Sequence, residues 1–317
     1  MKIVLASPRG FCAGVIRAIQ VVSEALQRFG PPVYVRHGIV HNKRVIEELA
    51  SRGAIFVEDP AEAPPGSILI FSAHGVSPAV RSAADGLHHR SIDATCPLVA
   101  KVHVEARHFA NDDYDILLIG HAGHVEVEGT LGEAPNHIRL IEDVEDARTV
   151  RVRDASRVAL LTQTTLSVDD TREIAEILTE RFPRIKAPRK GDICYATQNR
   201  QDAVKELARI AERILVISDA ESSNGIRLVE TARRAGVTAL RVEHAGELTS
   251  DWIASARVIG VTAGASVSEQ VVQGVVDRIV ELAWPERVEA ESMPIVEESV
   301  RFEIPRVLRD LPIRPIR

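Results

Sequence analysis

The sequence has few cysteines, no long apolar run and no excess of basic charge, and each absence excludes a class of protein. Its 3 cysteines, at positions 12, 96 and 194, are odd in number and too far apart for a disulfide framework or a local C-x-x-C metal clip. No stretch approaches the roughly 18 apolar residues of a transmembrane helix, and residues 3–6 are too short for a signal-peptide core. We therefore expect a cytoplasmic protein with no membrane partner.

The charge balance argues against polyanionic partners. The chain has 39 basic and 45 acidic residues, a formal net charge of -6, so we expect no nucleic acid as a partner. Local chemistry must therefore hold any anionic ligand. Apolar residues make up 45% and charged residues 26% of the 317, which is typical of folded globular proteins with about two domains or several smaller lobes.

Each cysteine precedes an amphipathic segment of helical period, and each segment leads into a short apolar strand. The segments cover residues 15–26, 98–109 and 201–211, and the strands cover residues 33–35, 116–119 and 214–217. Alternating strands and helices predict an α/β fold with parallel sheets. We expect three similar α/β lobes in a pseudo-threefold, trefoil-like arrangement around one central site.

The expected lobes follow the repeating pattern. The first lobe, residues 1–96, includes the N-terminal strand and the first two cysteines, and residues 97–193 and 194–284 form the second and third. Residues 285–317 form a C-terminal tail that packs back on the body, in which residues 300–304 alternate like an edge strand.

Polar loops follow the strands, and ligands bind at the carboxyl ends of the strands in open α/β sheets. We expect a hollow rich in hydrogen-bond donors that binds a phosphate or diphosphate, formed by His41, His74, His124, Ser222, Ser223, Asn224 and Ser266. Taken alone, each serine or asparagine is more typical of a helix cap, and each histidine of a surface or core residue.

Glu126 follows His124 by two residues in a loop that we expect to open on the same hollow. A carboxylic acid near bound anions has a raised pKa and suits proton donation. Thr165 is placed to orient a substrate hydroxyl. The ordinary alternatives are a first-turn glutamate that the helix dipole favours and a threonine that caps a helix or turn.

Three thiolates leave a tetrahedral metal site one ligand short, and two kinds of centre fit this pattern. Zinc, completed by His41, His74 or His124, predicts a phosphohydrolase or a structural site. An iron–sulfur cluster with one uncapped iron predicts electron transfer, binding of an oxygen at that iron, or a non-catalytic redox sensor. The residues alone leave these alternatives open.

Nine motifs, in their order and spacing, resemble the 4-hydroxy-3-methylbut-2-enyl diphosphate reductase family of the non-mevalonate isoprenoid pathway. The likeness extends from Ile3 to about Pro305. The motifs are SPRGFCAGV, YVRHGIVHN, FSAHGVS, DATCPLV, GHAGHVEVEGT, TQTTLSVDDT, DICYATQNRQ, SSNGIRL and VTAGAS.

The resemblance implies an iron–sulfur enzyme that converts 4-hydroxy-3-methylbut-2-enyl diphosphate to isopentenyl and dimethylallyl diphosphates, with a ferredoxin or flavodoxin as electron donor. It implies a [4Fe-4S] cluster on Cys12, Cys96 and Cys194, whose open iron binds the substrate hydroxyl. Glu126 then supplies protons and Thr165 holds the hydroxyl. The same motif match assigns the diphosphate and substrate contacts to His41, His74, His124, Ser222, Ser223, Asn224 and Ser266.

The chain departs from the family pattern at several loop positions. The family commonly has an acidic residue where Gly38 stands, a proline where Val125 stands and a serine where Gly225 stands. Gly225 therefore removes one possible hydroxyl beside the diphosphate, and Val125 changes the loop that aims Glu126.

Overall fold

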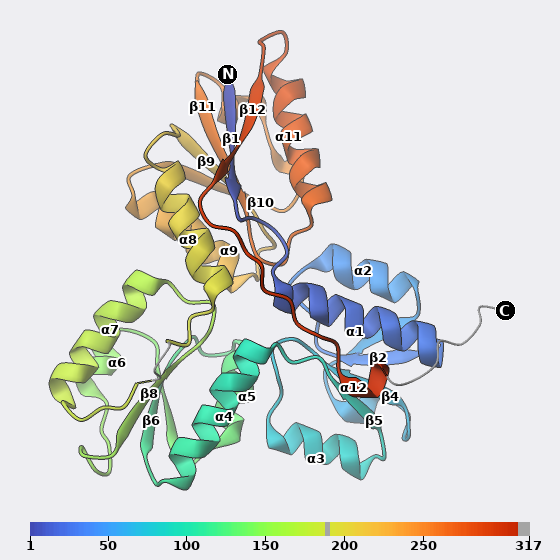
Figure 1. Ribbon diagram of the computed structural model, residues 1–317, viewed down its shortest axis with the longest axis vertical. Coiled ribbons are helices and arrows are strands. Elements are labelled where there is room, and N and C mark those ends of the chain that lie inside the picture. Colours follow the sequence, from blue (N-terminus) through green and yellow to red (C-terminus); the bar gives the residue numbers. More distant parts are fainter. Residues whose placement is uncertain (188–190, 310–317) are drawn as a thin grey trace. The chain divides into compact units, whose positions relative to one another are not determined.

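The computed structural model describes residues 1–187 and 191–309, and its strands form three parallel sheets (Figure 1). The predicted α/β class with parallel sheets is thereby confirmed. The chain divides into two compact units. The first unit comprises residues 1–12 and 195–300, and the second comprises residues 13–194 with the segment that starts at residue 301.

The first unit contains one five-stranded sheet in the order β10-β9-β11-β1-β12. The inner strands of this sheet read as nearly continuous apolar runs because helices cover both faces. Helices α8 and α9 pack on one face and α11 on the other (Figure 1), and α10 packs on the α11 face of the sheet. Its elements are β1 (Lys2–Ser7), α8 (Tyr195–Leu207), β9 (Arg213–Ile217), α9 (Ser223–Arg234), β10 (Thr238–Val242), η2 (Ala245–Glu247), α10 (Ser250–Ile253), β11 (Val258–Ala263), α11 (Glu269–Ala283) and β12 (Glu289–Pro294).

The second unit contains two sheets, β3-β2-β4-β5 and β7-β6-β8. Helices α4 and α5 pack on one face of the sheet around β6, and α6 and α7 pack on the other. Its elements are α1 (Ala13–Phe29), β2 (Val33–Arg36), α2 (Lys43–Ser51), β3 (Ala54–Val57), η1 (Pro60–Glu62), β4 (Ile68–Phe71), α3 (Pro78–Gly86), β5 (Arg90–Asp93), α4 (Pro97–Asn111), β6 (Asp115–Ile119), α5 (Val125–Glu133), β7 (Ile138–Ile141), α6 (Val144–Thr149), β8 (Val158–Thr162), α7 (Val168–Arg181) and α12 (Arg306–Arg309).

The first strand is the main difference from the expected lobes. The sequence pattern places it in the lobe of residues 1–96, but β1 lies between β11 and β12 in the sheet of the first unit (Figure 1). Ile3 and Ala6 are fully buried, and Val4 nearly so. A parallel strand that is apolar on both faces is stable only inside a sheet with helices on both sides, and this sheet provides that position.

The C-terminal tail also differs from the expected edge strand at residues 300–304, which lie outside any strand. The strand of the tail is β12, which pairs with β1 from Lys2 opposite Glu289 to Ser7 opposite Pro294. Most β12 side chains are exposed, so backbone hydrogen bonds hold this strand and no apolar alternation announces it. Residues 310–317 of the expected tail lie outside the described residues.

The segment that starts at residue 301 contacts α1 of the second unit through a buried arginine. Arg17 of α1 donates from Nε to the backbone oxygen of Glu303, at 2.8 Å.

None of the helices in residues 1–187 and 191–309 is both long enough and apolar enough to span a bilayer.

Candidate functional site

Three histidines of the second unit lie together beyond the carboxyl ends of its strands. His41 follows β2, His74 follows β4, and His124 follows β6. The ring centroids of His41 and His74 are 4.3 Å apart, those of His41 and His124 are 5.3 Å apart, and those of His74 and His124 are 6.3 Å apart. The structure therefore brings together, from two different sheets, the three imidazoles that the sequence singled out.

The imidazole cluster favours neutral rings. Burial lowers the pKa of His74 well below its ordinary value, and the neighbouring His41 and His124 lower it further. Burial, together with His41 and His121, lowers the pKa of His124 to about 4. An anion placed beside these rings would reverse part of that shift, because it favours the protonated imidazole.

His124 also begins helix α5 as its N-cap residue. Its Nδ1 accepts a hydrogen bond from the backbone N–H of Glu126, at 3.1 Å. In a neutral ring this contact assigns the proton to Nε2, since an accepting nitrogen carries none. The Nε2 atom is buried and has no hydrogen-bond partner in the described chain, so His124 retains one N–H for a ligand.

Glu126 is a buried carboxyl group in the first turn of α5, with only 3% of its surface exposed. Its Oε1 accepts from the backbone N–H of Thr164 at 2.6 Å, and its Oε2 lies 2.9 Å from Thr164 Oγ1. Burial raises its pKa to about 7, against the Thr164 bonds and with a smaller contribution from Asp192. A carboxyl group that titrates near neutral pH is suited to proton transfer.

Sequence reasoning missed Thr164. It selected Thr165, whose Oγ1 accepts instead from Gln163 Nε2 at 2.9 Å. Two adjacent threonines in a loop cannot be distinguished by sequence, because the conformation of the backbone decides which side chain faces Glu126. The role of Thr165 stays a prediction.

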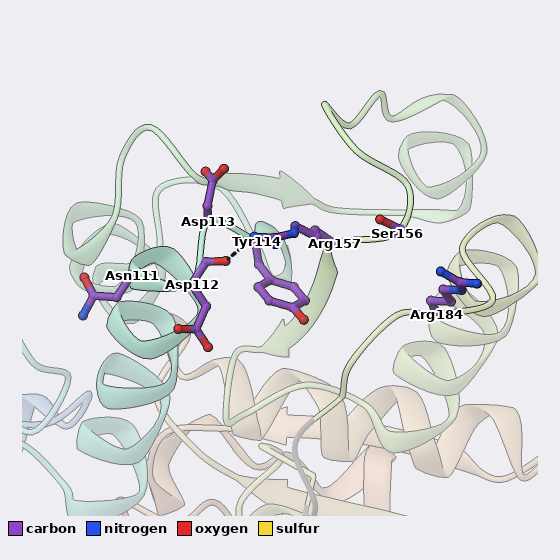
Figure 2. Close-up of a pocket in the computed structure, with 7 residues that line it drawn as sticks. All are labelled: Asn111, Asp112, Asp113, Tyr114, Ser156, Arg157 and Arg184. Atoms are coloured by element: carbon purple, nitrogen blue, oxygen red, sulfur yellow. Dashed lines mark hydrogen bonds between the residues drawn. The ribbon is translucent and has the colours of Figure 1, made fainter.

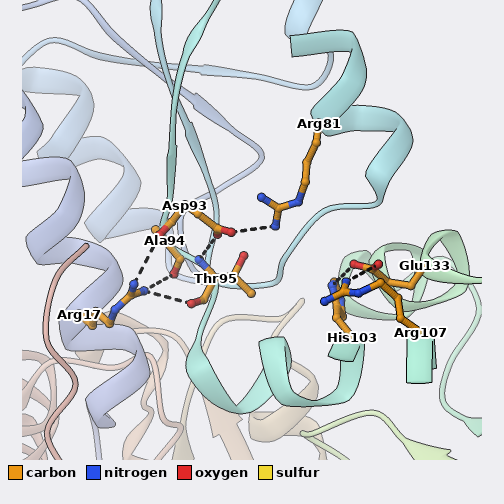
Figure 3. Close-up of polar contacts among 8 residues, drawn as sticks. All are labelled: Arg17, Arg81, Asp93, Ala94, Thr95, His103, Arg107 and Glu133. Carbon is orange, nitrogen blue, oxygen red and sulfur yellow. Dashed lines mark hydrogen bonds and ion pairs between the residues drawn. The ribbon is translucent and has the colours of Figure 1, made fainter. Parts of the chain in front are cut away.

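The loop before Cys96 is fixed by a set of charged side chains (Figure 3). Arg17 Nη1 donates to the backbone oxygens of Ala94 and Thr95, each at 3.0 Å. Asp93 Oδ1 accepts from the Thr95 N–H at 2.8 Å, while Asp93 Oδ2 pairs with Arg81 at 2.8 Å. Cys96 is therefore presented as the N-cap residue of α4 by a loop with little freedom.

Cys194 lies against the Thr164 loop. Its backbone N–H donates to the oxygen of Thr164, at 3.0 Å. Two residues earlier, Asp192 accepts from the Thr162 N–H at 3.1 Å and pairs with Lys101 of α4 at 3.0 Å. Lys101 therefore ties the helix that follows Cys96 to the segment that precedes Cys194.

In the first unit, the loop that carries Cys12 lies beside the loop after β11. The Cys12 N–H donates to the Ala265 oxygen at 3.0 Å, and the fully buried Arg200 donates to the Gly10 oxygen at 2.7 Å. Gly10 has a φ of +68°, and a Cβ on it would lie 2.8 Å from the Val267 oxygen. Glycine is therefore required for the loop to approach this closely.

Helix α9 begins at the predicted serine–serine–asparagine motif. Ser222 is its N-cap residue and accepts from the Gly225 N–H at 3.3 Å. Ser223, Asn224 and Ser266 are buried. Both amide atoms of the Asn224 side chain are buried and have no hydrogen-bond partner among the described residues. A helix start with unsatisfied buried polar groups suits an anionic ligand.

The three thiols lie in two units, with Cys12 in the first and Cys96 and Cys194 in the second. None forms a disulfide, and each is partly buried. Each directly precedes a helix, at the end that favours negative charge. Within the described part of the chain, no three His, Cys, Asp or Glu side chains form a group that could hold a metal ion. The cysteine ligand set therefore stays a prediction.

A separate open pocket lies at the other edge of the β6 sheet (Figure 2). It is lined by residues 111–114, which precede β6, by Ser156 and Arg157, which precede β8, and by Arg184. These residues mark the amino ends of the strands. His124 and Thr164 follow the carboxyl ends, so this pocket is distinct from the histidine cluster.

A scan of family models matches residues 3–280 to the family described as LytB protein. Among curated relatives, a protein of Nocardia farcinica is 51% identical over 309 residues, covering 97% of this chain and 91% of the relative. A protein of Psychrobacter arcticus is 52% identical over 314 residues, covering 98% of each. Both are named 4-hydroxy-3-methylbut-2-enyl diphosphate reductase.

Two solved structures are also similar. The E-1-hydroxy-2-methyl-but-2-enyl-4-diphosphate reductase of Plasmodium falciparum matches with a TM-score of 0.92 and 38% identity, over 97% of this chain and 96% of that one. A structure described as (E)-4-hydroxy-3-methyl-but-2-enyl diphosphate reductase, the terminal enzyme of the non-mevalonate pathway, matches with a TM-score of 0.62 and 29% identity. It covers 88% of this chain and 99% of its own.

Proposed function

Because this chain belongs to the LytB protein family, we propose that it reduces 4-hydroxy-3-methylbut-2-enyl diphosphate to isopentenyl and dimethylallyl diphosphates. The observation that carries the proposal is the buried Glu126 carboxyl, with a pKa of about 7, in the first turn of the helix that His124 caps. It combines a proton donor with an imidazole cluster suited to an anion.

The overall reaction requires proton delivery. The allylic C–O bond breaks, the substrate takes up two electrons and two protons, and the oxygen leaves as water. Protonated Glu126 supplies the proton that makes water, in place of hydroxide, the leaving group. Thr164 then stabilises the carboxylate, since its N–H and hydroxyl lie 2.6 and 2.9 Å from the two Glu126 oxygens.

The diphosphate would be held by neutral donors and imidazoles. His41, His74 and His124 supply ring N–H groups, and a bound anion raises the pKa of His74 and His124 and so favours their protonated forms. The other proposed contacts are the buried side chains at the start of α9 and in the loop after β11, namely Ser222, Ser223, Asn224 and Ser266. Thr165 is the proposed contact of the substrate hydroxyl.

Cys12, Cys96 and Cys194 are the proposed ligands of a [4Fe-4S] cluster. Three thiols that form no disulfide are soft donors, which suit iron–sulfur or zinc centres, and the family favours the cluster. Such a cluster supplies single electrons and a Lewis-acidic iron for the hydroxyl oxygen. A ferredoxin or flavodoxin is the proposed electron donor, and the cytoplasm the proposed location.

Anaerobic turnover tests this function. The purified chain, given reduced methyl viologen and 4-hydroxy-3-methylbut-2-enyl diphosphate, should form both product diphosphates, which mass spectrometry and NMR distinguish. Release of phosphate by a colourless protein with one equivalent of zinc would instead establish the phosphohydrolase alternative. A brown, iron-loaded protein that forms no product would establish the redox-sensor alternative.

A further inference from the structure

Ser218 is the first residue after β9, and its hydroxyl group has no hydrogen-bond partner within residues 1–187 and 191–309. Its side chain is among the most buried polar groups of the first unit, with 1% of the residue exposed. The backbone is fixed, because the Ser218 N–H donates to the Val242 oxygen at 2.9 Å and its oxygen accepts from Arg241 at 2.8 Å. Only the hydroxyl of this residue lacks a partner, and leaving it so is costly.

The Ser218 side chain fills the space beside Gly225. A Cβ on Gly225 would lie 2.1 Å from Ser218 Oγ and 2.3 Å from Ser218 Cβ. These separations are far below any van der Waals contact, so a side chain at position 225 is incompatible with Ser218. The glycine at 225 is therefore explained by the serine at 218, and the Ser218 hydroxyl lies at the first turn of α9.

Asn224 borders the same space. A Cβ on Gly264 would lie 3.3 Å from Ser218 Cβ and 3.7 Å from Asn224 Nδ2. The hydroxyl of Ser218 and both amide atoms of Asn224 are buried and have no partner in the part of the chain that the structure describes. Unsatisfied buried polar groups of this kind call for a ligand, and the N-terminal turn of α9 favours an anionic one.

We propose that Ser218 is a further substrate-binding residue, whose hydroxyl donates a hydrogen bond to the diphosphate beside Asn224. The inference rests on the proposed function of the same site.

The first test is Ser218→Ala, which keeps the Cβ and removes only the hydroxyl. The KM for 4-hydroxy-3-methylbut-2-enyl diphosphate should rise roughly tenfold, as expected for a hydrogen bond to a charged group, while kcat changes by less than about twofold. Calorimetry with inorganic diphosphate should show a parallel loss of affinity.

Thr262→Val is the matched control. The Thr262 hydroxyl is also fully buried and has no partner among the residues described, but it lies within β11. Its register partner is Val216, two residues before Ser218. This variant should keep the wild-type KM. Equal effects of the two substitutions would show that loss of any buried hydroxyl from this sheet weakens binding, and would overturn the proposal.

The second test exchanges the two residues. Gly225→Ser alone should lower the melting temperature and weaken binding, because its Cβ overlaps Ser218. The double variant Ser218→Gly with Gly225→Ser should recover a KM within about threefold of wild type. A folded Ser218→Ala variant with unchanged KM and diphosphate affinity overturns the proposal but leaves the function standing. Failure of the wild type to form product overturns the function, and the diphosphate calorimetry then decides whether Ser218 binds the anion.

Discussion

The helices α5 and α9 begin in the same way but offer a ligand different chemistry. In each, the N-cap side chain accepts from the N–H of a first-turn residue: His124 from Glu126 at 3.1 Å, and Ser222 from Gly225 at 3.3 Å. Among the described residues, both helix starts also keep buried polar atoms without partners. At α5 the side chains titrate, with pKa values of about 4 for His124 and about 7 for Glu126. At α9 the unpartnered groups are the Ser218 hydroxyl and the Asn224 amide, which are neutral.

The difference indicates that the two helix starts would contribute differently to the proposed binding of an anion. A helix start with titratable side chains can bind an anion and also exchange protons with it, so its contribution depends on pH. A helix start with neutral donors has no titrating side chain, so its own contribution to anion binding should not change with pH. The following predictions test this contrast.

The largest expected effect is that of Glu126→Gln. The amide can keep both contacts to Thr164, since its oxygen accepts from the N–H and its NH₂ donates to the hydroxyl. It cannot donate a proton, so kcat should fall by about 10²–10⁴ while substrate affinity is retained. Single-turnover kinetics at pH 7 would measure both.

Thr164→Val is the companion variant, because it removes only the hydroxyl contact to Glu126. We expect an intermediate loss of kcat and a shifted pH profile. If Glu126→Gln turned over at the wild-type rate, Glu126 would not be the proton donor of the reaction.

Asn224→Ala should have the next largest effect, on KM. Loss of hydrogen bonds to a charged diphosphate raises KM about 10- to 100-fold. The ratio of mutant to wild-type KM should be constant between pH 6 and 8, since no proton is involved. A ratio that varied strongly with pH would show that a titrating group takes part in binding at the start of α9 as well.

His124→Asn should change the pH dependence of binding by a few-fold. Asparagine can still cap α5, but it removes the ring that titrates. Anion binding raises the imidazole pKa, so the affinity of inorganic diphosphate should increase as pH falls from 7 toward 5. The comparison is best made in a Glu126→Gln background, which removes the carboxyl that titrates in the same range. There, His124→Asn should flatten the pH profile, and an unchanged slope would contradict the assignment.

The last predicted effect is on the free energy of unfolding and not on binding or turnover. The folded-state pKa of Glu126 is raised from 4.5 to about 7, so its stabilising contribution is full below pH 4.5 and is lost as pH rises through about 7. At pH 9, the free energy of unfolding of Glu126→Gln should therefore exceed that of the wild type by at most about 3 kcal/mol, as measured by urea unfolding. Near pH 5 the gap should be smaller. The same gap at both pH values would show that Glu126 does not titrate near 7.

The clustering of His41, His74 and His124 could be predicted because its signals are local. Each of these histidines follows an apolar strand, and parallel strands end at one edge of their sheet. The roles of the site residues stay predictions. Thr164 and Ser218 were missed because a serine or threonine in a loop gives the same local signal whether it caps a helix or faces a buried neighbour. Arg17 and Arg200 were missed because their partners are backbone oxygens far away in sequence.

The α/β fold could be predicted for the same reason, and the prediction was wrong where the signal is not local. Alternating apolar strands and amphipathic helices specify parallel sheets but do not say which sheet a first strand joins. The position of β1 depends on pairing with β11 and β12, more than 250 residues away. The β12 strand has mostly exposed side chains, so its backbone pairing leaves no hydrophobic pattern.

The proposed cluster is tested most directly by anaerobic analysis of iron and acid-labile sulfide in the wild type and in Cys12→Ser, Cys96→Ser and Cys194→Ser. We expect about four irons and four sulfides per wild-type chain, with a brown colour, and loss of both elements and of activity in each variant. A wild type that binds only zinc, or a variant that keeps its full cluster and activity, would show that the three cysteines do not hold such a cluster.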